Sequence, residues 1–186
     1  MTWQEIPGWL SEREAQALQD EAAAVRLDAA VVALGTWHGK SLMALCAAVK
    51  PGVQIHWYDN YLYLPGSRAS LQKDGGGDPE KARESAMAIS LGDPRVHPHL
   101  TDSISGAVVY AGPPIGLIYF DGHHDRTQVL AEIAMWIPNL DWRSPVLAFH
   151  DFHGGFQMAK AIRHVLPANL WRESGPHHSM ACFARL

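Results

Sequence analysis

The chain has 186 residues, 47% hydrophobic and 18% charged, so its composition is that of one globular domain over 1–186. A formal net charge of −4 leaves no broad positive surface and argues against nucleic acid or an anionic membrane as partner. The apolar runs are too short to span a bilayer and the opening segment lacks a signal-peptide pattern, so we expect a soluble, cytoplasmic protein.

Helix and strand signals alternate along most of the chain. Ser11 and Glu14 form a capping box that begins a helix over 12–25. An unalternating apolar run over 29–34 ends at Gly35, as expected of a strand buried on both faces. The remaining signals predict helices at 39–49, 78–91, 103–110, 126–138 and 156–166, and strands at 53–59, 95–100, 115–121 and 145–151.

This alternation predicts an α/β fold. Parallel neighbouring strands need crossover connections, so helices should cover both faces of a mostly parallel sheet. The runs 169–173 and 179–186 are separated by Ser-Gly-Pro-His-His and are interpreted as an antiparallel pair. Residues 60–77 contain Pro65 and a glycine triplet, so they form a long loop of the kind that often serves as a functional lid.

The first two strand ends carry signals for a nucleoside site, because open α/β sheets bind ligands at the carboxyl ends of their strands. Gly35 and Gly39 bracket a turn whose amides can approach a ligand, although glycine there can also serve packing alone. Asp59 ends the second strand, 24 residues after Gly35, where a carboxylate can accept ribose hydroxyls or cap a loop. The turn also resembles a Walker A loop of nucleotide triphosphatases, but three residues rather than four separate its glycines.

The ends of the fourth and fifth strands carry titratable side chains. Asp121 ends the fourth strand and is followed by His123 and His124, and His150 and Asp151 end the fifth. Both strands are expected near the centre of the sheet, so these groups should converge on one cleft suited to metal binding or acid–base chemistry. Oxygen ligands with one or two imidazoles suit magnesium, manganese or iron(II). Each histidine could instead cap a backbone carbonyl.

Five short motifs follow one another at 8–11 (Gly-Trp-Leu-Ser), 34–41 (Leu-Gly-Thr-Trp-His-Gly-Lys-Ser), 58–59 (Tyr-Asp), 120–124 (Phe-Asp-Gly-His-His) and 149–151 (Phe-His-Asp). Their order resembles that of the class I S-adenosylmethionine-dependent methyltransferases, and more narrowly is similar to macrocin-type sugar O-methyltransferases. The resemblance implies a three-layer, doubly wound, Rossmann-like sheet of seven strands, mostly parallel with an antiparallel last strand.

The resemblance also implies roles for individual residues. S-adenosylmethionine would lie along the strand ends, against Gly35, Thr36, Trp37, Gly39, Ser41, Asp59, Asp102, Ser103 and Asp121. A divalent metal (magnesium, manganese or iron) would be held by Asp121, His150 and Asp151. The base that removes the proton of the acceptor hydroxyl would be His124, or alternatively His123.

We therefore expect O-methylation of a small hydroxylated molecule, by a monomer or a homodimer. Tyr61, Tyr63 and Arg68 of the long loop are candidate acceptor contacts. Ala33 departs from the family pattern, which has an acid two residues before the first glycine, so a non-catalytic nucleoside-binding module is an alternative. His150 stands where macrocin-type relatives have a carboxylate, which lowers the negative charge of the metal site. A metal-dependent hydrolase that uses the same three metal-site residues is a further alternative.

Overall fold

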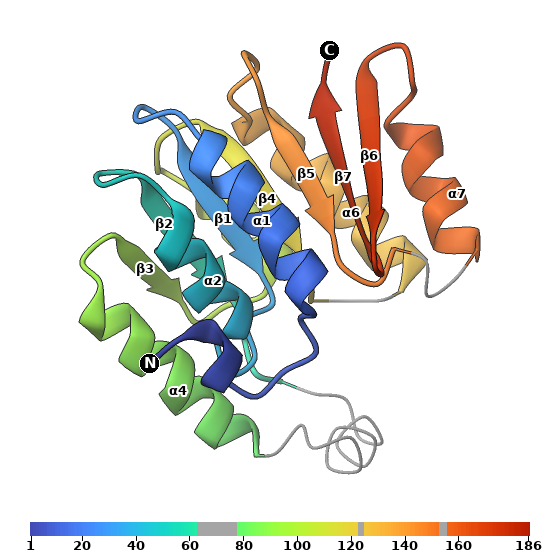
Figure 1. Cartoon of the computed structure of the whole chain (residues 1–186). Coiled ribbons are helices and arrows are strands. Elements are labelled where there is room, and N and C mark those ends of the chain that lie inside the picture. Colours follow the sequence, from blue (N-terminus) through green and yellow to red (C-terminus); the bar gives the residue numbers. More distant parts are fainter. Residues whose placement is uncertain (63–77, 123–124, 153–155) are drawn as a thin grey trace.

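A computed structural model describes residues 1–62, 78–122, 125–152 and 156–186. These residues form a seven-stranded sheet with the order β3-β2-β1-β4-β5-β7-β6 (Figure 1). β1 to β5 are parallel, and β7 runs antiparallel to both β5 and β6, which confirms the predicted fold class. The strands are β1 (Ala30–Leu34), β2 (Gln54–Tyr58), β3 (Val96–His99), β4 (Ile115–Phe120), β5 (Val146–Phe149), β6 (Trp171–His177) and β7 (Met180–Arg185).

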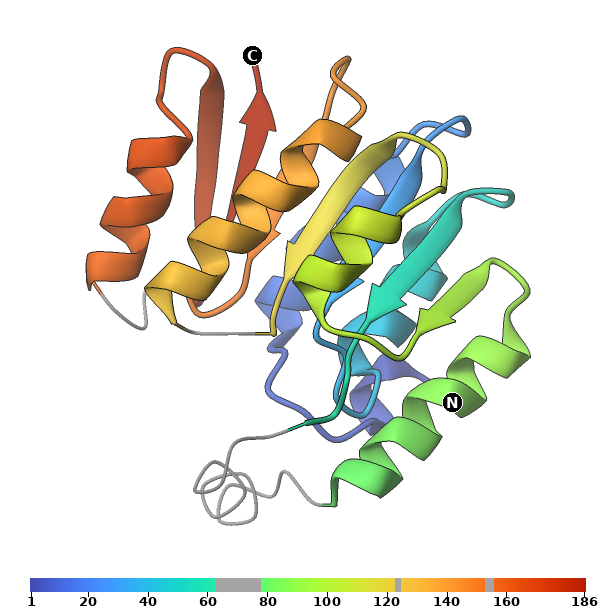
Figure 2. The ribbon, with the colours of Figure 1, turned by 180° about the vertical axis from the view of Figure 1, so that it is seen from behind.

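Helices cover both faces of the sheet (Figures 1 and 2). One layer consists of α1 (Glu12–Ala24), α2 (Lys40–Ala48) and α4 (Pro79–Gly92), and the other of α5 (Ser103–Val109), α6 (Arg126–Trp136) and α7 (Phe156–Val165). Val31 and Ala33 of β1 pack in the core under the first layer, and Val32 and Leu34 pack under the second. Successive strand residues face opposite sides, so a strand between two helical layers must be apolar throughout. Among the helices of the described residues, none has the length and apolar character needed to cross a membrane.

The described residues also form two short 3₁₀ helices, η1 (Trp3–Glu5) and η2 (Ile137–Asn139). The last strand pair differs from its prediction. β6 continues to His177, and the turn that joins it to β7 lies at 178–179. The pairing register shifts between Ser174 and His177, and Gly175 within this bulge has a φ of +122°. A bulge accommodates glycine and proline, which a regular ladder disfavours, so the Ser-Gly-Pro segment belongs to the strand.

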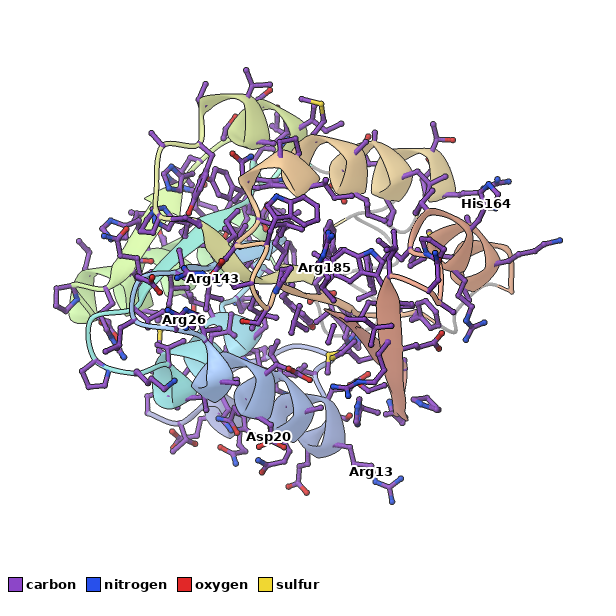
Figure 3. All side chains as sticks on the ribbon, turned by 90° about the horizontal axis from the view of Figure 1, so that it is seen from above. Arg13, Asp20, Arg26, Arg143, His164 and Arg185 are labelled. Carbon is purple, nitrogen blue, oxygen red and sulfur yellow. The ribbon has the colours of Figure 1, made fainter. Side chains whose placement is uncertain are left out.

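The edge of the sheet where the parallel strands begin carries charges that pair with one another. Arg143 lies 2.8 Å from Asp28 and 2.7 Å from Asp141, and Arg26 lies 3.1 Å from Asp28. Arg26 and Arg143 lie near each other when the molecule is seen from this edge (Figure 3). Asp141 is buried, whereas Asp28 and both arginines are about half exposed, and an exposed pair such as Arg143–Asp28 contributes about 0–1 kcal/mol. These pairs therefore bear on stability more than on ligand binding. The opposite edge, where the strands end, holds the candidate site.

Candidate functional site

A cavity of about 420 Å³ lies at the carboxyl ends of the central strands. The strand order reverses between β1 and β4, and α/β sheets bind their ligands at such a switch point. The volume falls within the range of roughly 300–1,000 Å³ that is usual for small-molecule sites. The predicted site residues on its wall are Gly35, Thr36, Trp37, Ser41, Asp59, Asp102, Ser103, Asp121, His150 and Asp151.

The turn after β1 needs glycine for close packing as well as for its backbone conformation. Gly35 has a φ of +83°, and a Cβ atom there would lie 2.5 Å from the carbonyl oxygen of Asp121. Gly39 has a φ of +88°, and its Cβ would lie 2.6 Å from Cδ1 of Ile89 in α4. Gly35 therefore brings the turn against the end of β4, and Gly39 brings α2 against α4. The packing role that the sequence left open is present at both positions.

Asp59 holds the glycine turn in place. Its Oδ2 accepts the backbone N–H groups of Thr36 at 2.9 Å and Trp37 at 3.2 Å, and its Oδ1 accepts that of Tyr61 at 2.8 Å. Burial raises the pKa of Asp59 above its ordinary value, and these three N–H groups oppose the rise. The loop-capping alternative is thus what the structure shows, and the contact of Asp59 with a ribose stays a prediction.

Tyr61 packs beneath the turn. Its side chain is only 8% exposed, and its hydroxyl donates to the carbonyl oxygen of Trp37 at 3.0 Å. The prediction that Tyr61 contacts an acceptor is therefore wrong, because its ring lies in the core. The other two loop candidates, Tyr63 and Arg68, lie outside the described residues.

A buried carboxylate that the sequence analysis missed lies beside Ser103. Asp102 caps α5 by accepting the backbone N–H of Ser105 at 2.8 Å, and the hydroxyl of Ser103 donates to Oε1 of Glu132. Glu132 is 1% exposed and lines the cavity from α6. The signal was available, because position 132 lies on the same helix face as the apolar stripe around Ile133, where a carboxylate is unusual.

The ends of β4 and β5 converge as predicted. Nδ1 of His150 lies 3.0 Å from Oδ1 of Asp121 and 3.5 Å from Oδ2 of Asp151. On the other side of the ring, Nε2 lies 3.7 Å from Oε1 of Glu14 in α1. Glu14 is fully buried, and Ser179 donates to the same Oε1 through its backbone N–H at 3.1 Å and its hydroxyl at 2.5 Å.

These contacts set the charges of the cluster. Burial lowers the pKa of His150, but the carboxylates of Asp121, Asp151 and Glu14 outweigh burial and raise it to about 12. Burial raises the pKa of Glu14, but the nearby imidazole of His150 and the hydrogen bonds donated by Ser179 and Ser11 hold it well below its usual range. The cluster therefore has the electrostatics of an imidazolium held among carboxylates.

The predicted metal site does not take the form of a metal shell. In the ranges that the structure describes, no group of three or more His, Cys, Asp or Glu side chains is arranged to hold a metal ion. Asp121, His150 and Asp151 lie together, but as an ion-pair cluster centred on the imidazole. The predicted bases, His123 and His124, lie outside the described residues. Metal binding and the identity of the base both stay predictions.

Residues 32–152 match the profile of a family described as a methyltransferase domain. No curated protein shows a significant match to the chain.

Solved structures share the fold over nearly the whole chain. A protein from Corynebacterium glutamicum has a TM-score of 0.70 at 14% identity, covering 97% of this chain and 82% of its own. The O-methyltransferase NovP has a TM-score of 0.70 at 12% identity, covering 93% and 79%. TomG from Streptomyces achromogenes, an O-methyltransferase of tomaymycin synthesis solved with S-adenosylmethionine, has a TM-score of 0.66 at 13% identity, covering 96% and 81%. At these identities the likeness establishes the fold.

Proposed function

Because the chain belongs to the methyltransferase-domain family, we propose that it transfers the methyl group of S-adenosylmethionine to a hydroxyl oxygen of a small molecule. One observation carries the proposal. A single cavity joins the glycine turn and Asp59 to the cluster around His150, so one bound ligand can reach from one to the other. The O-methyltransferases NovP and TomG, which share the fold, support oxygen as the acceptor atom.

The cavity has features that fit the proposed cofactor. Gly35 lets the turn approach closely, and Asp59 lies on the wall beside it, where its carboxylate can face a pentose. S-adenosylmethionine supplies a methyl group on a positively charged sulfur, so the residues mainly have to align and desolvate the reactants. Asp121 and Asp151 at the other end supply negative charge that attracts such a cation.

The acceptor must lose its hydroxyl proton, and we assign this task to His124. His124 follows Asp121 by three positions in the sequence, and an imidazole titrates near neutral pH. Divalent-metal assistance is a separate proposal, in which Asp121, Asp151 and His150 would rearrange around the ion. Activity that is lost with a chelator and restored by magnesium or manganese would support it.

Binding and turnover test the proposal in that order. Titration calorimetry with S-adenosylmethionine and S-adenosylhomocysteine should show saturable binding at one site per chain. A methyl-transfer assay against a panel of hydroxylated sugars and phenols should then yield a methylated product. Binding of ATP without binding of either sulfur compound would contradict the proposal and favour the triphosphatase alternative.

A non-catalytic nucleoside-binding module remains the second candidate, and Ala33 favours it. Position 33, near the end of β1, holds a fully buried alanine. An alanine side chain has no carboxylate to offer to the amino group of a methionine moiety. The module would bind S-adenosylhomocysteine but methylate no member of the panel.

A further inference from the structure

A buried hydroxyl of β4 has no hydrogen-bond partner in the described part of the chain. It belongs to Tyr119, whose side chain is fully buried in the core cluster beneath α1 and α2. Unpaired buried polar groups are rare and costly, because the group has given up its hydrogen bonds to water. The hydroxyl of Tyr119 therefore needs an explanation other than the stability of the fold.

The packing of the core would be satisfied by phenylalanine at this position. In the sheet, Tyr119 is paired with Ala33 of β1 and Ala148 of β5, two small residues between which a large ring can pack. All three residues are fully buried. A phenylalanine ring would fill the same space and bury no polar atom. Packing thus explains the ring of Tyr119 but not its hydroxyl.

The neighbours of this hydroxyl are the carboxylates of the cluster around His150. Asp121 follows Tyr119 by two positions, so both side chains face the same side of the sheet. The rings of Tyr119 and His150 are in a T-shaped arrangement with centroids 6.2 Å apart. Burial raises the pKa of the phenol well above its ordinary value, and the charges of Asp121, Glu14 and Asp151 add to the rise. Tyr119 is therefore a hydrogen-bond donor with acceptors close by.

Among these carboxylates, Asp121 interacts with the hydroxyl as an acceptor and also lines the cavity. The contact lacks the geometry of a regular hydrogen bond, so the hydroxyl counts as unpaired. Oδ1 of Asp121 lies 3.0 Å from Nδ1 of His150, and 28% of the Asp121 side chain is exposed. A carboxylate with this exposure has room to move, and a small movement would complete the bond with Tyr119.

We propose that Tyr119 is a positioning residue, which donates a hydrogen bond to Asp121 when a positively charged ligand enters the cavity and so holds the carboxylate against that charge. This inference rests on the proposed function, in which the cation is the sulfonium of S-adenosylmethionine. The backbone of Asp121 packs against Gly35, so its carboxylate lies beside the glycine turn. A cation there attracts the carboxylate, and the buried donor fixes it in the new position.

Titration calorimetry with two ligands tests the inference, because S-adenosylmethionine carries a positive charge on sulfur and S-adenosylhomocysteine does not. In Tyr119→Phe the affinity for S-adenosylmethionine should fall by about 10-fold or more, since a bond to a charged acceptor is lost. The affinity for S-adenosylhomocysteine should change by less than about twofold, because a neutral sulfur does not attract the carboxylate.

Tyr110→Phe is the matched control. The hydroxyl of Tyr110 donates to the carbonyl oxygen of Pro113 at 2.5 Å, and Tyr110 is not part of the cavity wall. This variant should bind both ligands as the wild type does. It should lower the melting temperature by about 2–4 °C, because it removes a hydrogen bond that the fold makes. In Tyr119→Phe the melting temperature should stay the same or rise, because an unpaired polar group leaves the interior.

A double variant shows whether Tyr119 acts through Asp121. Asp121→Asn should by itself weaken the binding of S-adenosylmethionine, because the charge that attracts the sulfonium is removed. Adding Tyr119→Phe to Asp121→Asn should then change the affinity by less than about twofold, since two residues that act as one unit are not additive. Independent, additive losses would overturn the positioning role.

The two proposals fail in different ways. If folded Tyr119→Phe binds both ligands as tightly as the wild type, or loses affinity for both equally, the role of Tyr119 is overturned while the proposed function stands. A fall in melting temperature equal to that of Tyr110→Phe would also overturn it, because the hydroxyl would then stabilise the fold. If the wild-type protein binds neither ligand, both proposals fail.

Discussion

The carboxylate of Glu14 lies 3.7 Å from the imidazole of His150, Oε1 to Nε2, and joins α1 to the end of β5. The two side chains are 0% and 6% exposed. Asp121 and Asp151 would still face His150 without Glu14, but the part-buried N–H and hydroxyl of Ser179 would lose their acceptor, and each unsatisfied group costs about 1–3 kcal/mol. We therefore expect Glu14→Ala to lower the free energy of unfolding by about 3 kcal/mol, measured by urea denaturation with circular dichroism.

Glu12→Ala is the matched control for this prediction. Glu12 is exposed in the first turn of the same helix, so its loss should cost less than about 1 kcal/mol. If the two variants lose equal stability, the buried carboxylate does not stabilise the fold.

The sequence predicts the fold well because its signals are local. The apolar run over 29–34 and the capping box of Ser11 and Glu14 each need only a few neighbouring residues to be recognised. The cluster at the ends of β4 and β5 could be predicted for a related reason, since the carboxyl ends of adjacent parallel strands meet at one edge.

What the sequence does not predict depends on distant partners. Glu14 fits the capping box, yet its second partner, Ser179, comes from the turn before β7, 165 residues away. The capping of the glycine turn by Asp59 depends on the β1–β2 register, which pairs Leu34 with Tyr58. The residue type and spacing of Asp59 are equally compatible with an acid that binds a ribose and with one that caps a loop. The pairing of the strands in three dimensions decides which contacts form.

Asp59→Asn should weaken both the fold and the binding of S-adenosylhomocysteine. The Asn side chain has one accepting oxygen, so its NH₂ group would face a backbone N–H that Asp59 now satisfies. We expect a loss of about 1–3 kcal/mol in unfolding free energy and at least about 10-fold in affinity. Urea denaturation and calorimetry measure the two effects.

Asp78→Asn provides a comparison for Asp59→Asn. Asp78 caps α4 by accepting the N–H of Glu80, and Asn and Asp are about equally good at such positions. Its stability should stay within about 0.5 kcal/mol of the wild type. A neutral result at both positions would show that the turn does not need the Asp59 carboxylate.

Gly35→Ala should be far more damaging than Gly52→Ala. Both glycines have positive φ, +83° and +91°, so both substitutions strain the backbone by about 1 kcal/mol. An added Cβ at Gly52 meets nothing within 4 Å, whereas at Gly35 it would lie 2.5 Å from a carbonyl oxygen. We expect an additional loss of about 2 kcal/mol or more for Gly35→Ala in thermal unfolding, from displacement of the turn. Equal melting temperatures for the two variants would contradict this close approach.

His124→Ala should separate turnover from binding. If His124 removes the acceptor proton, its loss should lower kcat by about 10²–10⁴-fold. The affinity for S-adenosylhomocysteine in calorimetry should change by less than about twofold, because a base acts on the acceptor. His164→Ala, which changes an exposed position of α7, should alter neither quantity. Unchanged turnover in His124→Ala would remove it from the mechanism.

The buried histidine of β2 gives the fold a dependence on acidic pH. His56 is 7% exposed, and its Nδ1 lies 3.1 Å from Nε2 of His99. Its ring also stacks on that of His97, with centroids 4.8 Å apart. Burial first, and then the positive charges of His97 and His99, lower the pKa of His56 to about 4.

The sign of this dependence follows from the lowered pKa. In the unfolded chain His56 takes up its proton near pH 6.5, while the folded protein keeps it neutral down to about pH 4. Its contribution to stability is therefore complete above about pH 6.5 and is lost as the pH falls toward 4. Between pH 7 and 5 we expect His56→Gln to lose about 2 kcal/mol less stability than the wild type.

His164→Gln removes a histidine that is exposed in both states and should follow the wild-type curve. Parallel curves for His56→Gln and the wild type, from urea denaturation at a series of pH values, would mean that His56 is not kept neutral by folding.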